Sequence, residues 1–126
     1  MFYTILCVGT GGFVGAILRF LFYFGFAQFF SQKYIFIATI CVNIIGSFII
    51  GFVLNIATTY AINYNFKNFL VTGLLGALTT FSTFTYENAV FLNHGEISKF
   101  FLNITMSIIL CLIFCFLGIY TAKIIH

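Results

Sequence analysis

The stretch GLLGALTTFSTFTYE, residues Gly73–Glu87, is the part of this chain around which the rest is organised. It lies inside a hydrophobic span, yet two glycines, Gly73 and Gly76, are followed by hydroxyl side chains at Thr79, Thr80, Ser82 and Thr83. Backbone N–H and C=O groups in a bilayer need partners, so such a segment leaves the regular helix only beside protein or a water-filled cavity. We therefore expect a helix weakened at these glycines and broken near the membrane midplane, where helix ends form a candidate ion site.

The composition places the 126 residues in a membrane. The chain is 63% hydrophobic and 6% charged, it lacks proline, and its mean hydropathy is +1.19. So few charged residues cannot cover the surface of a soluble domain. The net charge of +3 is scattered, which argues against a nucleic-acid partner. The cysteines lie in apolar runs without metal-ligand spacing, and no nucleophile–base pair is present, so the sequence does not predict an enzyme.

Four apolar runs each approach the ~20 residues that a helix needs to cross a bilayer. They are Phe2–Phe24, Ile35–Ala57, Phe69–Leu92 and Phe101–Ala122, joined by the polar connections Gly25–Tyr34, Thr58–Asn68 and Asn93–Phe100. No charged segment precedes the first run, so we expect it to be a retained transmembrane helix. The sequence thus predicts an all-α integral membrane protein with one four-helix domain over residues 1–126.

Small residues in the first span repeat at four-residue spacing. Gly11 and Gly15 form one such pair, and Gly12 and Ala16 form another. This spacing is typical of a face on which helices approach closely, so we expect a packing surface. Arg19 lies on the glycine side of the same helix, which favours an arginine turned toward a polar interior over one that reaches the membrane surface.

Two further spans carry stripes of polar residues. The second span has Thr39, Asn43, Ser47, Gly51 and Asn55 at successive four-residue intervals, and the fourth has Asn103, Ser107 and Cys111. Four-residue spacing keeps each set on one helix face. Such a stripe is either a hydrogen-bonded seam between helices or the lining of a pore. Asn43, near the centre of its span, could serve a neighbouring helix, a water or a permeating ion equally well.

Lysine and arginine placement does not select one orientation in the membrane. One side would carry Lys67 and Lys123, and the other Lys33, Lys99 and Arg19. The positive-inside rule needs an imbalance, so a chain this balanced could insert both ways. Four spans are also few for a pore within one subunit. We therefore expect an antiparallel, dual-topology homodimer.

The chain resembles the Fluc/CrcB family of fluoride channels. Three motifs carry the resemblance together with the polar track of the fourth span: GGFVGAILRF at Gly11–Phe20, NIIGSFIIGF at Asn43–Phe52 and GLLGALTTFSTF at Gly73–Phe84. The resemblance covers nearly the whole chain and implies a dual-topology homodimer with two parallel fluoride pores. It also implies a central structural Na⁺ held by the backbone carbonyls of Gly76 and Thr79, two from each subunit.

The resemblance assigns roles to individual residues. Phe81 and Phe84 would line the pores, one phenylalanine serving each pore. Asn43 would be the pore amide. The accompanying hydroxyl donors would be Thr39, Ser47, Ser82, Thr83 and Ser107. Arg19 and Glu87 would be vestibule or structural polar residues. The chain departs from the family pattern at Asn103, where a tyrosine is frequent, and at Cys111, where a serine is common.

These observations predict a passive channel that exports cytoplasmic fluoride across the inner (plasma) membrane. Amides, hydroxyls and the positive edges of phenylalanine rings replace the water around an anion without carrying a fixed charge that would trap it. One alternative is a small dual-topology exporter of drugs or other cations, which would need a membrane-embedded carboxylate. A second is a non-transporting structural subunit of a membrane complex.

Overall fold

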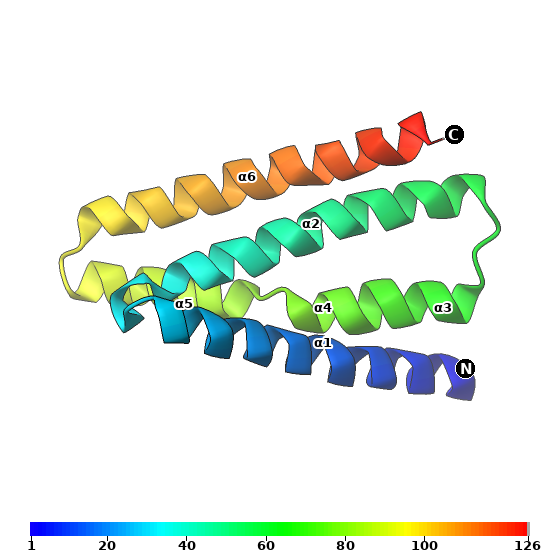
Figure 1. Cartoon of the computed structure of the whole chain (residues 1–126), viewed down its shortest axis with the longest axis horizontal. Helices are drawn as coiled ribbons and strands as arrows, with labels where there is room; N and C mark the ends of the chain where they lie inside the picture. Colours follow the sequence, from blue (N-terminus) through cyan, green and yellow to red (C-terminus); the bar gives the residue numbers. More distant parts are fainter. Residues whose placement is uncertain (126) are drawn as a thin grey trace.

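The structure, a computed structural model, describes residues 1–125 and is built of helices joined by short connections (Figure 1). Within these residues, four helical segments are long and apolar enough to cross a membrane. They are Phe2–Phe29, Gln32–Thr59, Tyr64–Asn93 and Ile97–Ile124. The predicted all-α fold with four spans is confirmed.

The elements follow one another with little chain between them. The first span is α1 (Phe2–Phe29), and the second is the short 3₁₀ turn η1 (Gln32–Tyr34) continued by α2 (Ile35–Thr59). The third span has four pieces: α3 (Tyr64–Asn68), the π-helix η2 (Phe69–Leu75), α4 (Gly76–Leu78) and α5 (Phe81–Asn93). The fourth span is α6 (Ile97–Ile124).

The predicted ends of the spans were too short. Helix α1 runs through Gly25 to Phe29, and α6 begins at Ile97 rather than Phe101. A glycine inside a helix costs only about 1 kcal/mol relative to alanine, so Gly25 does not end an otherwise apolar helix. The predicted connection Thr58–Asn68 also contains helix α3, whose first turn is capped by the Asn63 side chain, which accepts hydrogen bonds from two backbone amides.

The helices are arranged as two pairs (Figure 1). Helix α2 packs along α6, and α1 packs along η2 and α4. Near the α5 end the pairs are joined by a small apolar core of Phe36, Ile40 and Phe91. The rings of Phe36 and Phe91 meet edge to face with centroids 5.3 Å apart. Both chain ends lie at the opposite end of the bundle (Figure 1).

The glycines of α1 form a close packing surface against the third span, as predicted. A Cβ atom on Gly11 would collide with the carbonyl oxygen of Phe69, and one on Gly15 would collide with the carbonyl oxygen of Leu74. From the other side, a Cβ on Gly73 would come 2.6 Å from the carbonyl oxygen of Val8. The two backbones therefore touch directly, which a side chain at any of these positions would prevent.

The third span leaves the helix at two threonines. Thr79 (φ −77°, ψ 157°) and Thr80 (φ −149°, ψ 115°) are extended, and α5 begins at Phe81. Around the two glycines the chain departs from the regular α-helix only as far as the π-helix η2, which contains Gly73, while Gly76 is helical (φ −62°, ψ −33°). The interruption itself follows three residues after Gly76. The β-branched threonines, which favour extended backbone, stand where the helix stops.

Substituting Gly11 should separate α1 from η2. We expect Gly11→Ala to lower the free energy of unfolding by about 1–3 kcal/mol, because the added methyl group overpacks a backbone contact. Gly25→Ala is the matched control, since a Cβ there meets no atom within 4 Å. It should be neutral or slightly stabilising. Unfolding in detergent, followed by circular dichroism, compares the two, and equal stability of both variants would contradict the packing role of Gly11.

Candidate functional site

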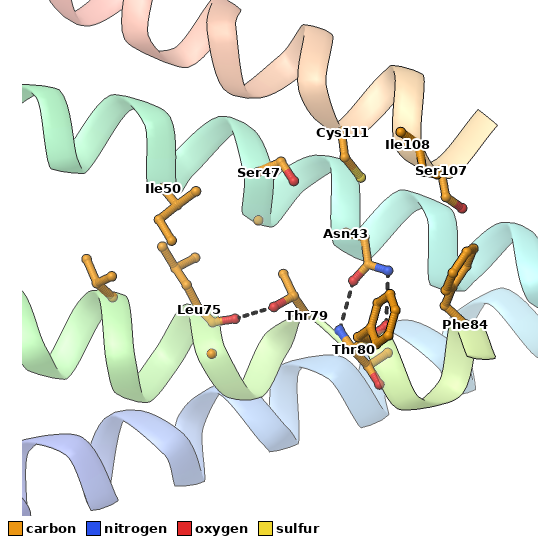
Figure 2. Close-up of a pocket in the computed structure, with 14 residues that line it drawn as sticks. Asn43, Ser47, Ile50, Leu75, Thr79, Thr80, Phe84, Ser107, Ile108 and Cys111 are labelled. Carbon is orange, nitrogen blue, oxygen red and sulfur yellow. Dashed lines mark hydrogen bonds between the residues drawn. The ribbon is translucent and has the colours of Figure 1, made fainter. Parts of the chain in front are cut away.

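The extended residues of the third span are held by one side chain of α2. The Oδ1 atom of Asn43 accepts a hydrogen bond of 2.8 Å from the backbone N–H of Thr80, and its Nδ2 atom donates one of 3.1 Å to the carbonyl oxygen of Thr80 (Figure 2). The amide of Asn43 thus supplies both partners that Thr80 loses where the helix is interrupted. This pairing meets the requirement for backbone satisfaction away from water.

Threonine hydroxyls complete the two helix ends. The Thr80 Oγ1 atom accepts a hydrogen bond of 3.2 Å from the backbone N–H of Thr83, which caps the N-terminus of α5. At the preceding end, Thr79 donates to the carbonyl oxygen of Leu75 twice, from its backbone N–H at 3.0 Å and from its Oγ1 at 2.9 Å. The interruption is therefore an ordered structure.

The interruption also changes what two backbone carbonyls can do. In a continuous α-helix the N–H of Thr80 would bond the carbonyl oxygen of Gly76, but here it donates to Asn43. The Gly76 oxygen is thus released from its helical partner. The carbonyl oxygen of Thr79 accepts a 3.3 Å hydrogen bond from Nη1 of Arg19, which turns inward from α1. A carbonyl oxygen has two lone pairs, so this contact leaves one of them available.

A cavity of about 390 Å³ lies beside this interruption, between α2, α6 and the third span (Figure 2). We call it the central cavity. Its lining residues are Asn43, Gly46, Ser47, Ile50, Val71, Leu75, Gly76, Thr79, Thr80, Phe81, Phe84, Ser107, Ile108 and Cys111. The polar stripes of the second and fourth spans thus meet, because both contribute side chains to one cavity. None of the lining side chains carries a formal charge.

The central cavity gathers most, not all, of the predicted pore residues. Asn43, Ser47, Phe81, Phe84 and Ser107 line it, as do Gly76 and Thr79. The hydroxyl residues Thr39, Ser82 and Thr83 are not among its lining residues. Phe84 is partly buried, whereas the side chain of Phe81 is 79% exposed, and the two ring centroids lie 5.5 Å apart.

Thr39 belongs instead to a second polar group around Glu87. Its Oγ1 donates a 2.5 Å hydrogen bond to Oε1 of Glu87 and lies 2.6 Å from the hydroxyl of Tyr23. Because the one proton of Thr39 is used by Glu87, the Tyr23 hydroxyl is the donor in the other bond. Sequence reasoning missed Tyr23, although it lies one helical turn after Arg19 on α1.

The same group continues toward the central cavity. The Asn103 side chain lies beside the Glu87 carboxyl, and Ser107 donates a 3.5 Å hydrogen bond to Oδ1 of Asn103. Oε2 of Glu87 and Nδ2 of Asn103 are buried, and neither has a hydrogen-bond partner within residues 1–125. Ser107 lines the central cavity, so Glu87, Asn103 and Ser107 form a row of polar side chains that leads to that cavity.

Glu87 also borders a further cavity of about 330 Å³, which we call the Glu87 cavity. It lies where η1 meets the turn between α5 and α6. Its lining residues are Gln32, Lys33, Ile35, Phe36, Tyr86, Glu87, Val90, Phe91, His94, Glu96 and Lys99. Unlike the central cavity, it carries several charged side chains.

Comparison with known proteins identifies relatives along almost the whole chain. Residues 6–119 match the family model described as CrcB-like protein, Camphor Resistance (CrcB). A protein of Campylobacter fetus named fluoride-specific ion channel FluC is 46% identical, covering 99% of this chain and 98% of the relative. Proteins of the same name from Sulfurovum and Methanococcus aeolicus are 45% and 41% identical, over 96% and 90% of this chain and 94% and 90% of the relatives.

Removing the Asn43 amide should destabilise the interruption. We expect Asn43→Ala to lower the free energy of unfolding in detergent by about 2 kcal/mol or more, because two backbone groups of Thr80 lose their partners and each costs about 1–3 kcal/mol. Asn55→Ala on the same helix stripe is the control. It removes a side chain for which the described residues show no hydrogen bond, so its effect should stay within about 0.5 kcal/mol. Similar losses of unfolding free energy in both variants would show that the Asn43 amide does not stabilise the interruption of the third span.

Proposed function

This chain belongs to the CrcB family, and from that membership we propose that it is a fluoride-specific channel through which cytoplasmic fluoride leaves the cell passively. The observation that carries the proposal is the central cavity, whose polar groups are donors without formal charge. The relatives named as fluoride channels support the same function, because they match this chain over nearly the full length of both proteins. We place the channel in the inner (plasma) membrane as a multi-pass protein.

Fluoride is small and strongly hydrated, so a pore must replace its water with hydrogen-bond donors. Asn43 uses only one N–H of its amide on Thr80, which leaves the second for an anion. The Ser47 hydroxyl adds a donor one helical turn along α2, on the same wall of the central cavity as Asn43. Ser107 lines the cavity from α6, and its proton is held by a long bond of 3.5 Å to Asn103. Neutral donors bind an anion strongly enough to admit it and weakly enough to release it, as conduction requires.

Phe81 and Phe84 differ in how far their side chains are buried beside this pathway. Phe84 lies at the central cavity near Ser107 (Figure 2), where the positive edge of its ring can face an anion. Phe81 begins α5, and most of its side chain is uncovered in a single chain. We propose that the two rings serve different pores, Phe84 the pore of its own chain and Phe81 the pore nearer the partner.

We propose that two copies assemble in opposite orientations and so form two parallel pores. The balanced lysines at the two ends of the helices support insertion both ways. The exposed Phe81 supports a partner on that side of the chain. A two-fold axis in the membrane plane would relate the copies, so that each membrane face presents one end of each chain.

The released carbonyl of Gly76 fits the expected structural Na⁺. Na⁺ is a hard cation that takes oxygen ligands, and the Gly76 oxygen lacks its helical donor. The Thr79 oxygen fits less completely, because Arg19 already donates to it. Two carbonyls from each copy would supply four oxygens to the ion, which would hold the helix interruptions of the two chains together.

The remaining predicted residues act around the pore. We propose that Glu87 lines a vestibule and that Thr39 orients its carboxyl, since the proton of Thr39 is committed to Oε1. Arg19 supports the interruption through Thr79. Thr83 belongs to the capped first turn of α5, and Ser82 lies within 3.2 Å of the Thr80 hydroxyl. These hydroxyls therefore shape the helix end beside the pore.

Fluoride efflux from liposomes tests the proposed function. Purified protein is reconstituted into liposomes loaded with potassium fluoride, valinomycin provides the counter-current, and an electrode outside reads fluoride. We expect rapid fluoride loss without comparable loss in a matched potassium chloride experiment. A folded, dimeric protein that releases no fluoride would refute a channel, and proton release driven by an organic cation would instead indicate an exporter.

Replacing either phenylalanine should slow this efflux while leaving the protein folded. We expect Phe81→Ile and Phe84→Ile each to reduce the fluoride rate at least tenfold, because an aliphatic side chain has no positive ring edge for the anion. Phe116→Ile is the control, since Phe116 is 67% exposed and lines none of the described cavities. Size-exclusion chromatography checks the assembly. Wild-type rates in both variants would exclude the ring-edge mechanism.

A further inference from the structure

We propose that the Glu87 cavity is an anion-collecting mouth of the pore and that Lys33 supplies its effective positive charge. The inference rests on the proposed function, and it concerns charged residues that the conduction pathway described above does not use. Its subject is how fluoride is gathered from solution before it reaches the neutral donors of the central cavity. The ligand class is a small inorganic anion.

The rim of the Glu87 cavity contains more basic than acidic side chains. Lys33 comes from η1, His94 from the turn after α5, and Lys99 from the first turn of α6. On the same rim, Glu96 is the acidic residue, while Glu87 is buried on the α5 wall. Two parts of the chain thus bring basic groups to one opening: Lys33 is distant in the sequence, whereas His94 and Lys99 are five residues apart.

Two of the rim charges neutralise each other. Nζ of Lys99 lies 2.7 Å and 2.8 Å from the two carboxylate oxygens of Glu96 and 5.6 Å from the ring centroid of Phe91. The hydrogen bond from Lys99 lowers the pKa of Glu96 below its usual value, so this carboxylate stays ionised at neutral pH. The Lys99–Glu96 pair therefore contributes little net charge to the opening.

The charge of Lys33, unlike that of Lys99, is not neutralised by an ion pair within residues 1–125. Lys33 lies with its Nζ 6.0 Å from the ring centroid of Tyr34. It is exposed, yet close enough to Glu96 to act on that carboxylate through space. A charge at the mouth of a cavity with apolar walls raises the local concentration of counter-ions, and the effect weakens with ionic strength.

An anion gathered here has a polar route inward. Glu87 lies on the wall of this cavity, Asn103 lies beside its carboxyl, and Ser107 bonds Asn103 and lines the central cavity. Within residues 1–125, Nδ2 of Asn103 has no hydrogen-bond partner, so it is a neutral donor on this route. Lys33 thus attracts the anion at the mouth, and neutral donors conduct it within the protein.

Ionic strength separates this electrostatic role from a structural one. Fluoride efflux is measured from proteoliposomes at an ionic strength of about 10 mM and again at about 500 mM with potassium gluconate, with osmolarity balanced by sucrose. The Debye length falls from about 30 Å to under 8 Å between these conditions. The variants are Lys33→Gln, Glu96→Gln and the control Lys67→Gln. Lys67 has the same 6.0 Å relation to a tyrosine ring but lines none of the described cavities.

We expect Lys33→Gln to slow efflux about threefold or more at low ionic strength and Glu96→Gln to accelerate it, because the two substitutions change the rim charge in opposite directions. Both differences should vanish at high ionic strength, and Lys67→Gln should match the wild type throughout. If wild-type efflux is present but Lys33→Gln equals Lys67→Gln, the inference is wrong. A loss that persists at high salt also overturns it, as it assigns Lys33 to membrane anchoring. Absence of wild-type efflux would refute the proposed function instead.

Discussion

The pairing of backbone groups at the interruption of the third span is the constraint on which the rest of this structure depends. A helix that stops inside a bilayer exposes amides and carbonyls that water cannot reach, so other parts of the chain must satisfy them. Asn43 meets both groups of Thr80, and the Thr80 hydroxyl caps α5. This pairing diverts the Thr80 amide from Gly76, so the Gly76 carbonyl lacks its usual helical donor.

The same constraint explains why each neighbouring helix has a distinct composition. Helix α1 carries glycines because it must approach η2 closely, and it sends Arg19 to the carbonyl of Thr79. Helix α2 carries the amide that replaces the missing helical bonds. Helix α6 lies against α2 and offers hydroxyl and thiol groups to the remaining space. The central cavity is thus lined by side chains without formal charge, and the neighbouring helices α1 and α2 supply hydrogen bonds to the backbone of the interruption.

The sequence predicted the four spans and the glycine packing surface, because each follows from a pattern along a single helix. It could not assign separate roles to Gly73 and Gly76, since a glycine in a helical span can either weaken the helix or allow close packing, and Gly73 packs against α1. The assignment of Thr39 to the pore stays a prediction. Periodicity places Thr39 on the face of Asn43, but Thr39 lies one helical turn before Asn43 on α2, where its partners are Tyr23 and Glu87.

The π-helix η2 sets the register between the third span and α1. Residues five apart lie about one turn apart in a π-helix, whereas in an α-helix they point in clearly different directions. The carbonyls of Phe69 and Leu74, five residues apart, can therefore both face α1, at Gly11 and Gly15, which are four residues apart. Five positions of one helix are matched to four of the other. Deleting a single residue from Phe69–Leu75 would restore α-helical phase and rotate one of these carbonyls away from its glycine, so length here is as strict a requirement as residue identity.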